Sequence, residues 1–303
     1  MIKRKPESTN IYFDDYIRNF SELADGTKTV AAFYEDEPFP NYNGINSRHL
    51  MTQQAELGQY SRAISELCPT DGSFLEIGCG TGQLTNYVGL EPNRIAIGLD
   101  LSKASLDLAG AFKLKTSIAN TKFLRADIFD HPFEKDSFDV VVANGVLHHT
   151  IDTWQALRQI EEILKPGGYA VIGLYNFYGR WRTNVLRKVS HLLGCRLLAL
   201  LDPITNRKLN KNAARSWIKD QYFHPLERSH SYDECIKYMN NSALNIVRFI
   251  PDPLNFYPQE KKLNLAEERN IGTLFDRFSA QLLQGALDHA DGGLFSVIYR
   301  KED

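Results

Sequence analysis

Seven short apolar runs, separated by helical patterns, organise most of the chain. Each run has the length and the continuous apolar character of a strand buried on both faces; the runs cover residues 73–78, 94–100, 121–127, 137–144, 169–175, 244–250 and 294–300. Helical patterns cover residues 47–67, 82–87, 102–114 and 154–164. Because strand and helix alternate strictly through the first five runs, the pattern predicts an α/β fold with a doubly wound, mostly parallel sheet of seven strands. A helical stretch separates the sixth run from the last, and we expect the last strand to lie antiparallel beside the sixth strand.

An arm rich in aromatic residues precedes this centre. Residues 1–46 form the arm, and eight of the 32 residues from 11 to 42 are aromatic, against 11% for the whole chain. The rings either seal the edge of a core or form a lid over a ligand, and composition does not choose between the two.

A basic helical insertion follows the fifth strand. It covers residues 179–230, and its first 41 residues hold ten Lys or Arg and one acid, a local charge of +9 that leaves −11 for the rest of the chain. The pattern predicts either a helical cap with a solvated basic side or a surface that grips a partner. Residues 231–303 then return to the core with the last two strands and a helical insertion between them.

Composition and charge limit the classes of protein that need to be considered. The chain has 303 residues and a net charge of −2, from 35 basic and 37 acidic side chains, which argues against a general polyanion binder. No apolar run reaches the ~20 residues that span a bilayer, and the N-terminus lacks the apolar stretch of a secretory signal, so we expect a cytoplasmic protein. The four cysteines are scattered and indicate free thiols.

A glycine-rich segment follows the first strand, where an open α/β sheet binds its ligands. It reads Glu76-Ile77-Gly78-Cys79-Gly80-Thr81-Gly82. Alternate glycines allow a ligand to approach the backbone and permit positive φ in the turn. A dinucleotide-binding turn would need a glycine at position 83 or 85, where the chain has Gln83 and Thr85, so a pyrophosphate ligand is disfavoured.

Polar side chains also end the next three strands. Asp100 ends the second strand and is placed to accept hydrogen bonds from ribose hydroxyls. Asp127-Ile128 ends the third strand and offers an acceptor for an exocyclic amine beside an apolar face, and Asn144-Gly145 ends the fourth. Any one Asp is equally well explained as a helix N-cap, but four correctly spaced strand ends favour one binding site.

Three further motifs accompany these residues: Leu-Asp at 99–100, Val-Leu-His-His at 146–149 and Lys-Pro-Gly-Gly at 165–168. Together, the motifs resemble those of the class I S-adenosylmethionine-dependent methyltransferases. The resemblance covers about residues 70–175 and the closing strands, and implies a Rossmann-like core at 47–178. It implies that the cofactor is S-adenosylmethionine, held by Glu76, Gly78, Cys79, Gly80, Gly82, Asp100, Leu101, Asp127, Ile128, Asn144 and Gly145. Neither an Asn-Pro-Pro-Tyr motif nor a cysteine follows the fourth strand, which disfavours methylation of planar exocyclic amines and the covalent pyrimidine mechanism.

The acceptor side has several histidines and tyrosines. A sulfonium is an activated methyl donor, so one base can suffice, and a histidine near its ordinary pKa of about 6.5 could deprotonate a phenol or a carboxyl-like acceptor. The catalytic candidates are His148, His149 and His224, each of which could instead fix a loop. The expected pocket residues are Tyr34, Tyr42, Tyr175, Tyr178 and Tyr222. His224, Glu227 and His230 form a weak metal-site pattern, and we expect no metal.

The sequence therefore predicts methyl transfer to a small or carrier-bound organic acceptor, with the nucleophile unresolved. One alternative is an RNA or protein methyltransferase that uses the basic cap, although the net charge disfavours a nucleic-acid partner. Another is a cofactor-binding fold that acts as a binding module without methyl transfer. The oligomeric state stays open.

Overall fold

A computed structural model describes residues 14–15, 23–36, 38, 45–181, 183–188, 218–219, 221–255, 262–287 and 293–303. The predicted arm is thus described mainly from residue 23, and most of the predicted cap at 179–230 lies outside the described residues. No helix in the described ranges is long and apolar enough to cross a membrane.

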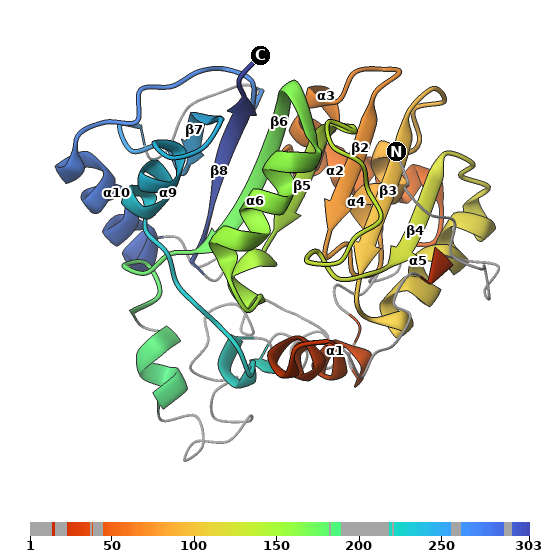
Figure 1. The fold of residues 1–303 in the computed structure, drawn as a ribbon, viewed down its shortest axis with the longest axis horizontal. Coiled ribbons are helices and arrows are strands. Elements are labelled where there is room, and N and C mark those ends of the chain that lie inside the picture. The colour runs from red at the N-terminus through yellow and green to blue at the C-terminus, as the bar shows by residue number, and fades with distance from the viewer. Residues whose placement is uncertain are drawn as a thin grey trace.

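One twisted sheet forms the centre of the molecule (Figure 1). Its strands are β1 (Asp14–Asp15), β2 (Ser73–Ile77), β3 (Ile95–Asp100), β4 (Thr121–Arg125), β5 (Phe138–Asn144), β6 (Leu164–Tyr175), β7 (Leu244–Ile250) and β8 (Leu294–Lys301). They lie in the order β1-β4-β3-β2-β5-β6-β8-β7. Strand β8 pairs antiparallel with both β6 and β7, and the other pairs are parallel. The seven predicted strands and the antiparallel last strand are confirmed; β1 is an additional two-residue strand that the sequence did not predict.

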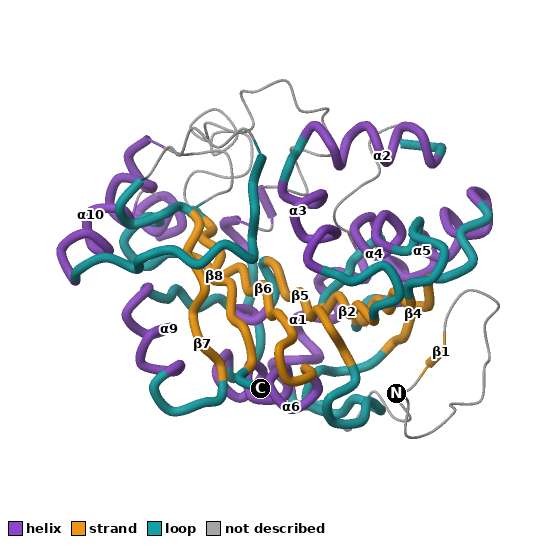
Figure 2. The backbone as a smooth tube through the Cα atoms, turned by 90° about the horizontal axis from the view of Figure 1, so that it is seen from above, coloured by secondary structure: helices purple, strands orange, loops and turns teal. Residues whose placement is uncertain are grey.

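Helices cover both faces of the sheet, as Figure 2 shows. They are α1 (Asp25–Asp36), α2 (Arg48–Leu57), α3 (Tyr60–Leu67), α4 (Gln83–Val88), α5 (Lys103–Thr116), α6 (Thr153–Ile163), α9 (Tyr232–Met239) and α10 (Leu274–Leu287). Alternate residues of β2 explain the two layers: Leu75 packs in the core cluster that contains α6, while Phe74 packs in the cluster that contains α3. Side chains on both faces of the central strands are therefore buried, as the continuous apolar runs indicate.

The single helix expected at 47–67 is wrong, because the chain breaks between α2 and α3. Gly58 ends α2, and Gln59 has φ of 51°, a left-handed conformation that interrupts helical hydrogen bonding. Tyr60 thereby begins a new helix whose first residues line the cavity described below.

The strand order places a crevice above the centre of the sheet. The chain runs outward from β2 to β3 and β4, then returns to β5 and β6 on the other side of β2. The loops that leave β2 and β5 therefore diverge at their carboxyl ends, where open α/β sheets bind ligands. Helix α1 lies across this edge of the sheet in Figure 1.

Candidate functional site

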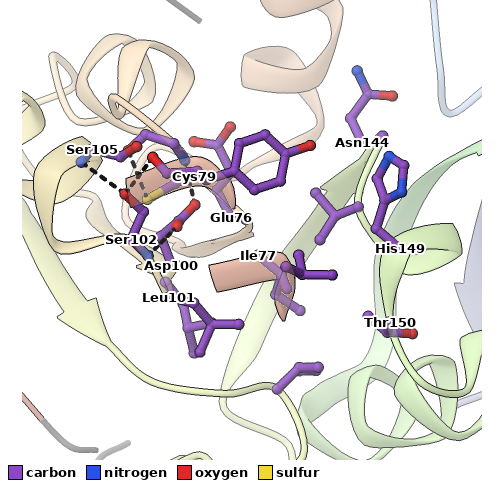
Figure 3. Close-up of a pocket in the computed structure, with 18 of the residues that line it drawn as sticks. Glu76, Ile77, Cys79, Asp100, Leu101, Ser102, Ser105, Asn144, His149 and Thr150 are labelled. Carbon is purple, nitrogen blue, oxygen red and sulfur yellow. Dashed lines mark hydrogen bonds between the residues drawn. The ribbon is translucent and has the colours of Figure 1, made fainter. Parts of the chain in front are cut away.

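A cavity of about 470 Å³ lies at the carboxyl ends of the central strands (Figure 3). This volume is within the range of small-molecule and cofactor sites. Ten of the eleven residues predicted to bind the cofactor line the cavity: Glu76, Gly78, Cys79, Gly80, Asp100, Leu101, Asp127, Ile128, Asn144 and Gly145. Residues from the ends of four strands, β2, β3, β4 and β5, thus meet in one site.

The glycine loop between β2 and α4 leaves no room for side chains. Gly78 has φ of 65°, and a Cβ atom there would lie 2.4 Å from a methyl carbon of Val146. Gly82 has φ of 72°, and a Cβ atom there would lie 2.6 Å from the ring of Phe123. Gly82 does not line the cavity, so the structure assigns it a packing role, and its predicted contact with a cofactor stays a prediction.

Two carboxylates hold the loop in place. Asp100 accepts hydrogen bonds from the backbone N–H groups of Gly80 (2.7 Å) and Ser102 (2.8 Å). Glu76 accepts from the backbone N–H of Thr85 (2.9 Å) and from its hydroxyl. Burial raises the pKa of Glu76 to about 7 and raises the pKa of Asp100 above its ordinary value. Both groups therefore carry a desolvation cost, as is common in binding sites.

Asp127 and Ile128 form the wall beyond β4. One carboxylate oxygen of Asp127 accepts a hydrogen bond from the backbone N–H of Phe129 (3.1 Å), and burial raises the pKa of this carboxyl. Ile128 is buried beside it and belongs to the main core cluster. An acceptor group next to an apolar surface matches the pattern expected for a purine site.

The rings of the predicted catalytic histidines are in contact and tilted against one another, but only one of these residues lines the cavity. His149 lines it, and its Nδ1 lies 2.7 Å from the carbonyl oxygen of Leu226. The rings of His148 and His224 lie 4.2 Å and 3.7 Å from that of His149, between centroids, and neither residue lines the cavity. His148 is fully buried, and its ring nitrogens have no hydrogen-bond partner among the described residues.

The expectation of a histidine near its ordinary pKa is wrong for two of the three. Burial, together with the smaller effect of the cations of Arg180 and Arg187, lowers the pKa of His149 to about 3. Burial also lowers the pKa of His148 well below its ordinary value. Both imidazoles are neutral at physiological pH and are weak proton acceptors.

The predicted pocket tyrosines separate into two groups. Tyr34 and Tyr175 line the cavity. Tyr178 packs edge-on against Phe177 and Phe278, and Tyr222 is buried in a small cluster with Ile218; neither lines the cavity. Tyr42 lies outside the described residues.

The segment with His224, Glu227 and His230 does not converge on a common point. Glu227 pairs with Arg180 (3.2 Å) and Arg187 (2.8 Å). His230 instead contacts Thr153 (3.0 Å) and Glu234 (3.1 Å). Among the described residues, no group of three His, Cys, Asp or Glu side chains is placed to hold a metal ion.

Two arginines of the predicted basic cap point inward, whereas most of its other basic residues lie outside the described residues and the solvated basic side stays a prediction. The side chain of Arg180 is 0% exposed and that of Arg187 is 26% exposed. The guanidinium carbon of Arg180 lies 3.6 Å from the ring centroid of Tyr175. Its Nη1 donates to Gln221 (2.7 Å), whose amide donates to the hydroxyl of Tyr175 (2.7 Å). These two cations face the protein interior.

Sequence reasoning missed several lining residues. They include Thr27, Val30 and Ala31 of α1, Tyr60 and Ser61 of α3, and Gln83, Ser102, Ser105, Thr150, Gln221 and Leu294. Thr150 and Ser102 directly follow predicted site residues, so their positions could have been inferred. The contributions of α1, α3 and Gln221 depend on tertiary packing, for which the sequence has no local signal.

Comparison with known proteins identifies the central segment. Residues 75–172 match the family described as a methyltransferase domain. The chain is 40% identical over 103 residues to demethylmenaquinone methyltransferase of Lactococcus lactis, covering 33% of this chain and 40% of that protein. It is 32% identical over 101 residues to 27-O-demethylrifamycin SV methyltransferase of Amycolatopsis mediterranei, covering 33% of this chain and 37% of that protein. The chain therefore spans less than half the length of these curated relatives.

Solved structures share the fold. The structure of PKMT2 from Rickettsia typhi has a TM-score of 0.56 and 19% sequence identity, over 80% of this chain and 52% of that chain. The domain match assigns residues 75–172 to a methyltransferase domain of the class I, S-adenosylmethionine-dependent type, and the solved structure shows that the fold is shared. The cofactor of the domain is S-adenosylmethionine.

The residues of the cavity fit this cofactor. The loop at Gly78 is a cradle that a Cβ atom would close, and Asp100 and Asp127 present carboxylates from adjacent strand ends. Asp100 would hold the ribose hydroxyls, and Asp127 with Ile128 would hold the adenine. Glu76 would fix the loop and face the cationic amino group. The cavity also extends to the side of β5 and β6, where His149 and Tyr175 line it.

Proposed function

We propose that the protein transfers a methyl group from S-adenosylmethionine to a small or carrier-bound organic acceptor. The observation that carries this proposal is the extent of the cavity. It continues from the carboxylates at the ends of β2, β3 and β4 to His149, Tyr175 and Gln221 on the side of β5 and β6. One cavity can thus hold donor and acceptor side by side.

The chain's contribution is mainly to position the acceptor. The sulfonium of the bound cofactor supplies an already activated methyl group. An acceptor atom held in line at ~3 to 3.5 Å can then react with little further catalysis, since orientation alone can lower a barrier by several kcal/mol. His149, Tyr175 and Gln221 orient the acceptor, and α1 excludes water from the opposite side.

Helix α1 supports the interpretation of the arm as a lid. Thr27, Val30, Ala31 and Tyr34 of α1 line the cavity. The hydroxyl of Ser102 donates to the backbone oxygen of Tyr34 (3.1 Å), which ties α1 to the loop after β3. We propose that α1, the described helix of the arm at residues 1–46, covers the cofactor and the acceptor together.

Several observations favour an organic acceptor over RNA or protein. Arg180 and Arg187 of the basic insertion are bound to Glu227 and face inward, so they do not add to a basic surface. Two relatives bear the names of a demethylmenaquinone and a 27-O-demethylrifamycin SV methyltransferase, and both names denote organic compounds. The cytoplasmic location inferred from the sequence stays a prediction.

Transfer of an isotope-labelled methyl group tests the proposal. The full chain is incubated with S-adenosylmethionine that carries a labelled methyl group, in parallel with a library of small organic acceptors, with total RNA and with a protein fraction. Mass spectrometry should find the label in small compounds. Label in RNA or protein alone would favour the alternative, and tight cofactor binding without any transfer would favour a binding module.

A further inference from the structure

The two ends of the cavity differ in charge. Among the described lining residues, the carboxylates are Glu76, Asp100 and Asp127, and all three belong to the strand ends of β2, β3 and β4. The end formed by β5 and β6 presents His149, Tyr175 and Gln221 instead. The cationic donor and the acceptor thus occupy opposite electrostatic environments.

A buried cation lies directly behind the acceptor end. The guanidinium of Arg180 stacks on the ring of Tyr175 at 3.6 Å and donates a hydrogen bond to Gln221, so it contacts two residues of the cavity wall. Arg187 lies beside it, and both cations contact the carboxylate of Glu227. Interactions in a buried site are weakly screened, so these cations act on a bound molecule across one layer of side chains.

The effect of these cations is visible at His149. Burial is the main cause of the low pKa of His149, and Arg180 and Arg187 lower it in the same direction, as cations near the cavity wall would. Nδ1 of His149 lies 2.7 Å from the carbonyl oxygen of Leu226 and therefore carries the proton of the neutral ring. The rings of His148 and His224 contact that of His149, and burial keeps His148 neutral too. Neither His148 nor His149 is thus a strong base for an acceptor of high pKa.

We propose that the acceptor is an apolar compound with an acidic hydroxyl, a phenol or an enol, which binds as its oxyanion beside Tyr175, Gln221 and His149 and is held there by the field of Arg180 and Arg187. The inference rests on the proposed function and names its acceptor class. The two guanidinium groups would repel a protonated amine across the cavity wall. Such an amine would also have no lone pair with which to attack the methyl group. An aliphatic alcohol would need a strong base.

The reaction balances without a protein base. The acidic hydroxyl loses its proton to water on binding. The oxyanion then forms a bond to the methyl carbon, while the carbon–sulfur bond breaks and its electron pair passes to sulfur. One negative and one positive charge give two neutral products, a methyl ether and a thioether. Arg180 and Arg187 are positioning residues here, since they act through the wall and not on the reacting atoms.

Binding of a chromogenic phenol tests this inference independently of turnover. The probe is 4-nitrophenol, which absorbs in the visible only as its phenolate, and it is titrated with pH in the presence of the full chain saturated with S-adenosylhomocysteine. Bound to the wild type, its apparent pKa should fall by about 1, a tenfold change in its ionisation constant. The matched cation is 4-nitrobenzylamine, which should bind at least tenfold more weakly.

Two variants and a control assign the effect to Arg180 and Arg187. Arg180→Met and Arg187→Met should each remove most of the tenfold change, and Arg187→Met keeps the test valid if Arg180→Met does not fold. Arg300→Met is the control, because Arg300 lies at the opposite end of the sheet, beside Gly167, and it should behave as the wild type.

Two results would overturn the inference while leaving the proposed function in place. One is that 4-nitrophenol does not bind to the complex that holds S-adenosylhomocysteine, or that it binds there with its own pKa unchanged or raised. The other is tighter binding of the amine. Failure to bind S-adenosylhomocysteine would instead contradict the proposed function itself.

Discussion

The side chain of Asp100 lies between the glycine loop and the expected ribose site. Its two oxygens already accept hydrogen bonds from Gly80 and Ser102, and each oxygen retains a further lone pair. Asp100 therefore shapes the loop and remains able to accept hydroxyl hydrogens. The N-cap of α5 is Ser102, whose hydroxyl accepts a hydrogen bond from the backbone N–H of Ser105, so Asp100 is not the helix cap that the sequence left open.

Replacement of Asp100 with Ala should weaken binding of S-adenosylmethionine by roughly 1–3 kcal/mol, because the ribose would lose charge-assisted hydrogen bonds. Isothermal titration calorimetry measures this difference. Asp107→Ala is the matched control, since Asp107 is a partly exposed residue of α5 that pairs with Lys103. Equal affinities of the Asp100 and Asp107 variants would remove Asp100 from the site.

Buried neutral histidines should make the fold sensitive to acid. The pKa of His149 falls from 6.5 to about 3 on folding, so between these values the unfolded chain binds a proton that the folded chain does not. The free energy of unfolding due to His149 is therefore fully present above pH 6.5 and is lost as the pH falls toward 3. Glu76, with its pKa raised to about 7, has the opposite effect, so only a comparison of variants isolates His149.

Denaturant unfolding between pH 6 and 4 provides that comparison. The wild type should lose about 1.4 kcal/mol more per pH unit than His149→Gln, the value for one proton. The control is His49→Gln, which removes an imidazole from an exposed residue and should keep the wild-type slope. Identical slopes for the wild type and His149→Gln would show that His149 is not buried as a neutral group.

At the scale of helices and strands, the sequence predicted the elements that depend on the pattern of neighbouring residues alone. Continuous apolar runs identify strands that are buried on both faces, and the residues after them mark the site, so Asp100 and Asp127 were found. The break at Gln59 was not predictable, because a left-handed Gln has no sequence signature. The contact of Arg180 with Glu227 joins residues 47 positions apart, and only the tertiary fold shows that this part of a basic segment is internal.

Helix α1 should be required for tight binding but not for folding of the sheet. Deletion of residues 1–42 should leave a chain that unfolds cooperatively, because the core clusters at the sheet involve residues after that point. Its affinity for S-adenosylhomocysteine should fall about tenfold, since the lid excludes water from the site. Circular dichroism and calorimetry measure the two properties.

Two neighbouring alanines provide a control within α1. Ala31 is 3% exposed and lines the cavity, whereas Ala32 is exposed. Ala31→Gln should reproduce the loss of affinity because its side chain would enter the cavity, and Ala32→Gln should not. Full affinity in both the deletion and Ala31→Gln would exclude α1 from the site.

At the scale of the whole molecule, the fold brings five strand ends and α1 around one cavity, and the distribution of charge divides that cavity into a donor half and an acceptor half. The carboxylates lie on the side of β2 to β4, and the buried cations lie behind β6. The net charge of −2 conceals this separation, which becomes visible only when the chain is folded.

The central claim is that the cavity is an S-adenosylmethionine site. The most direct test is to titrate the full chain with S-adenosylhomocysteine and, separately, with NAD. The glycine loop lacks the sixth-position glycine of a dinucleotide site, while Asp100 and Asp127 line the cavity where ribose and adenine are expected. Calorimetry should therefore show saturable binding of S-adenosylhomocysteine at one site per chain and no binding of NAD. Tight binding of NAD without binding of S-adenosylhomocysteine would contradict the account of the cavity.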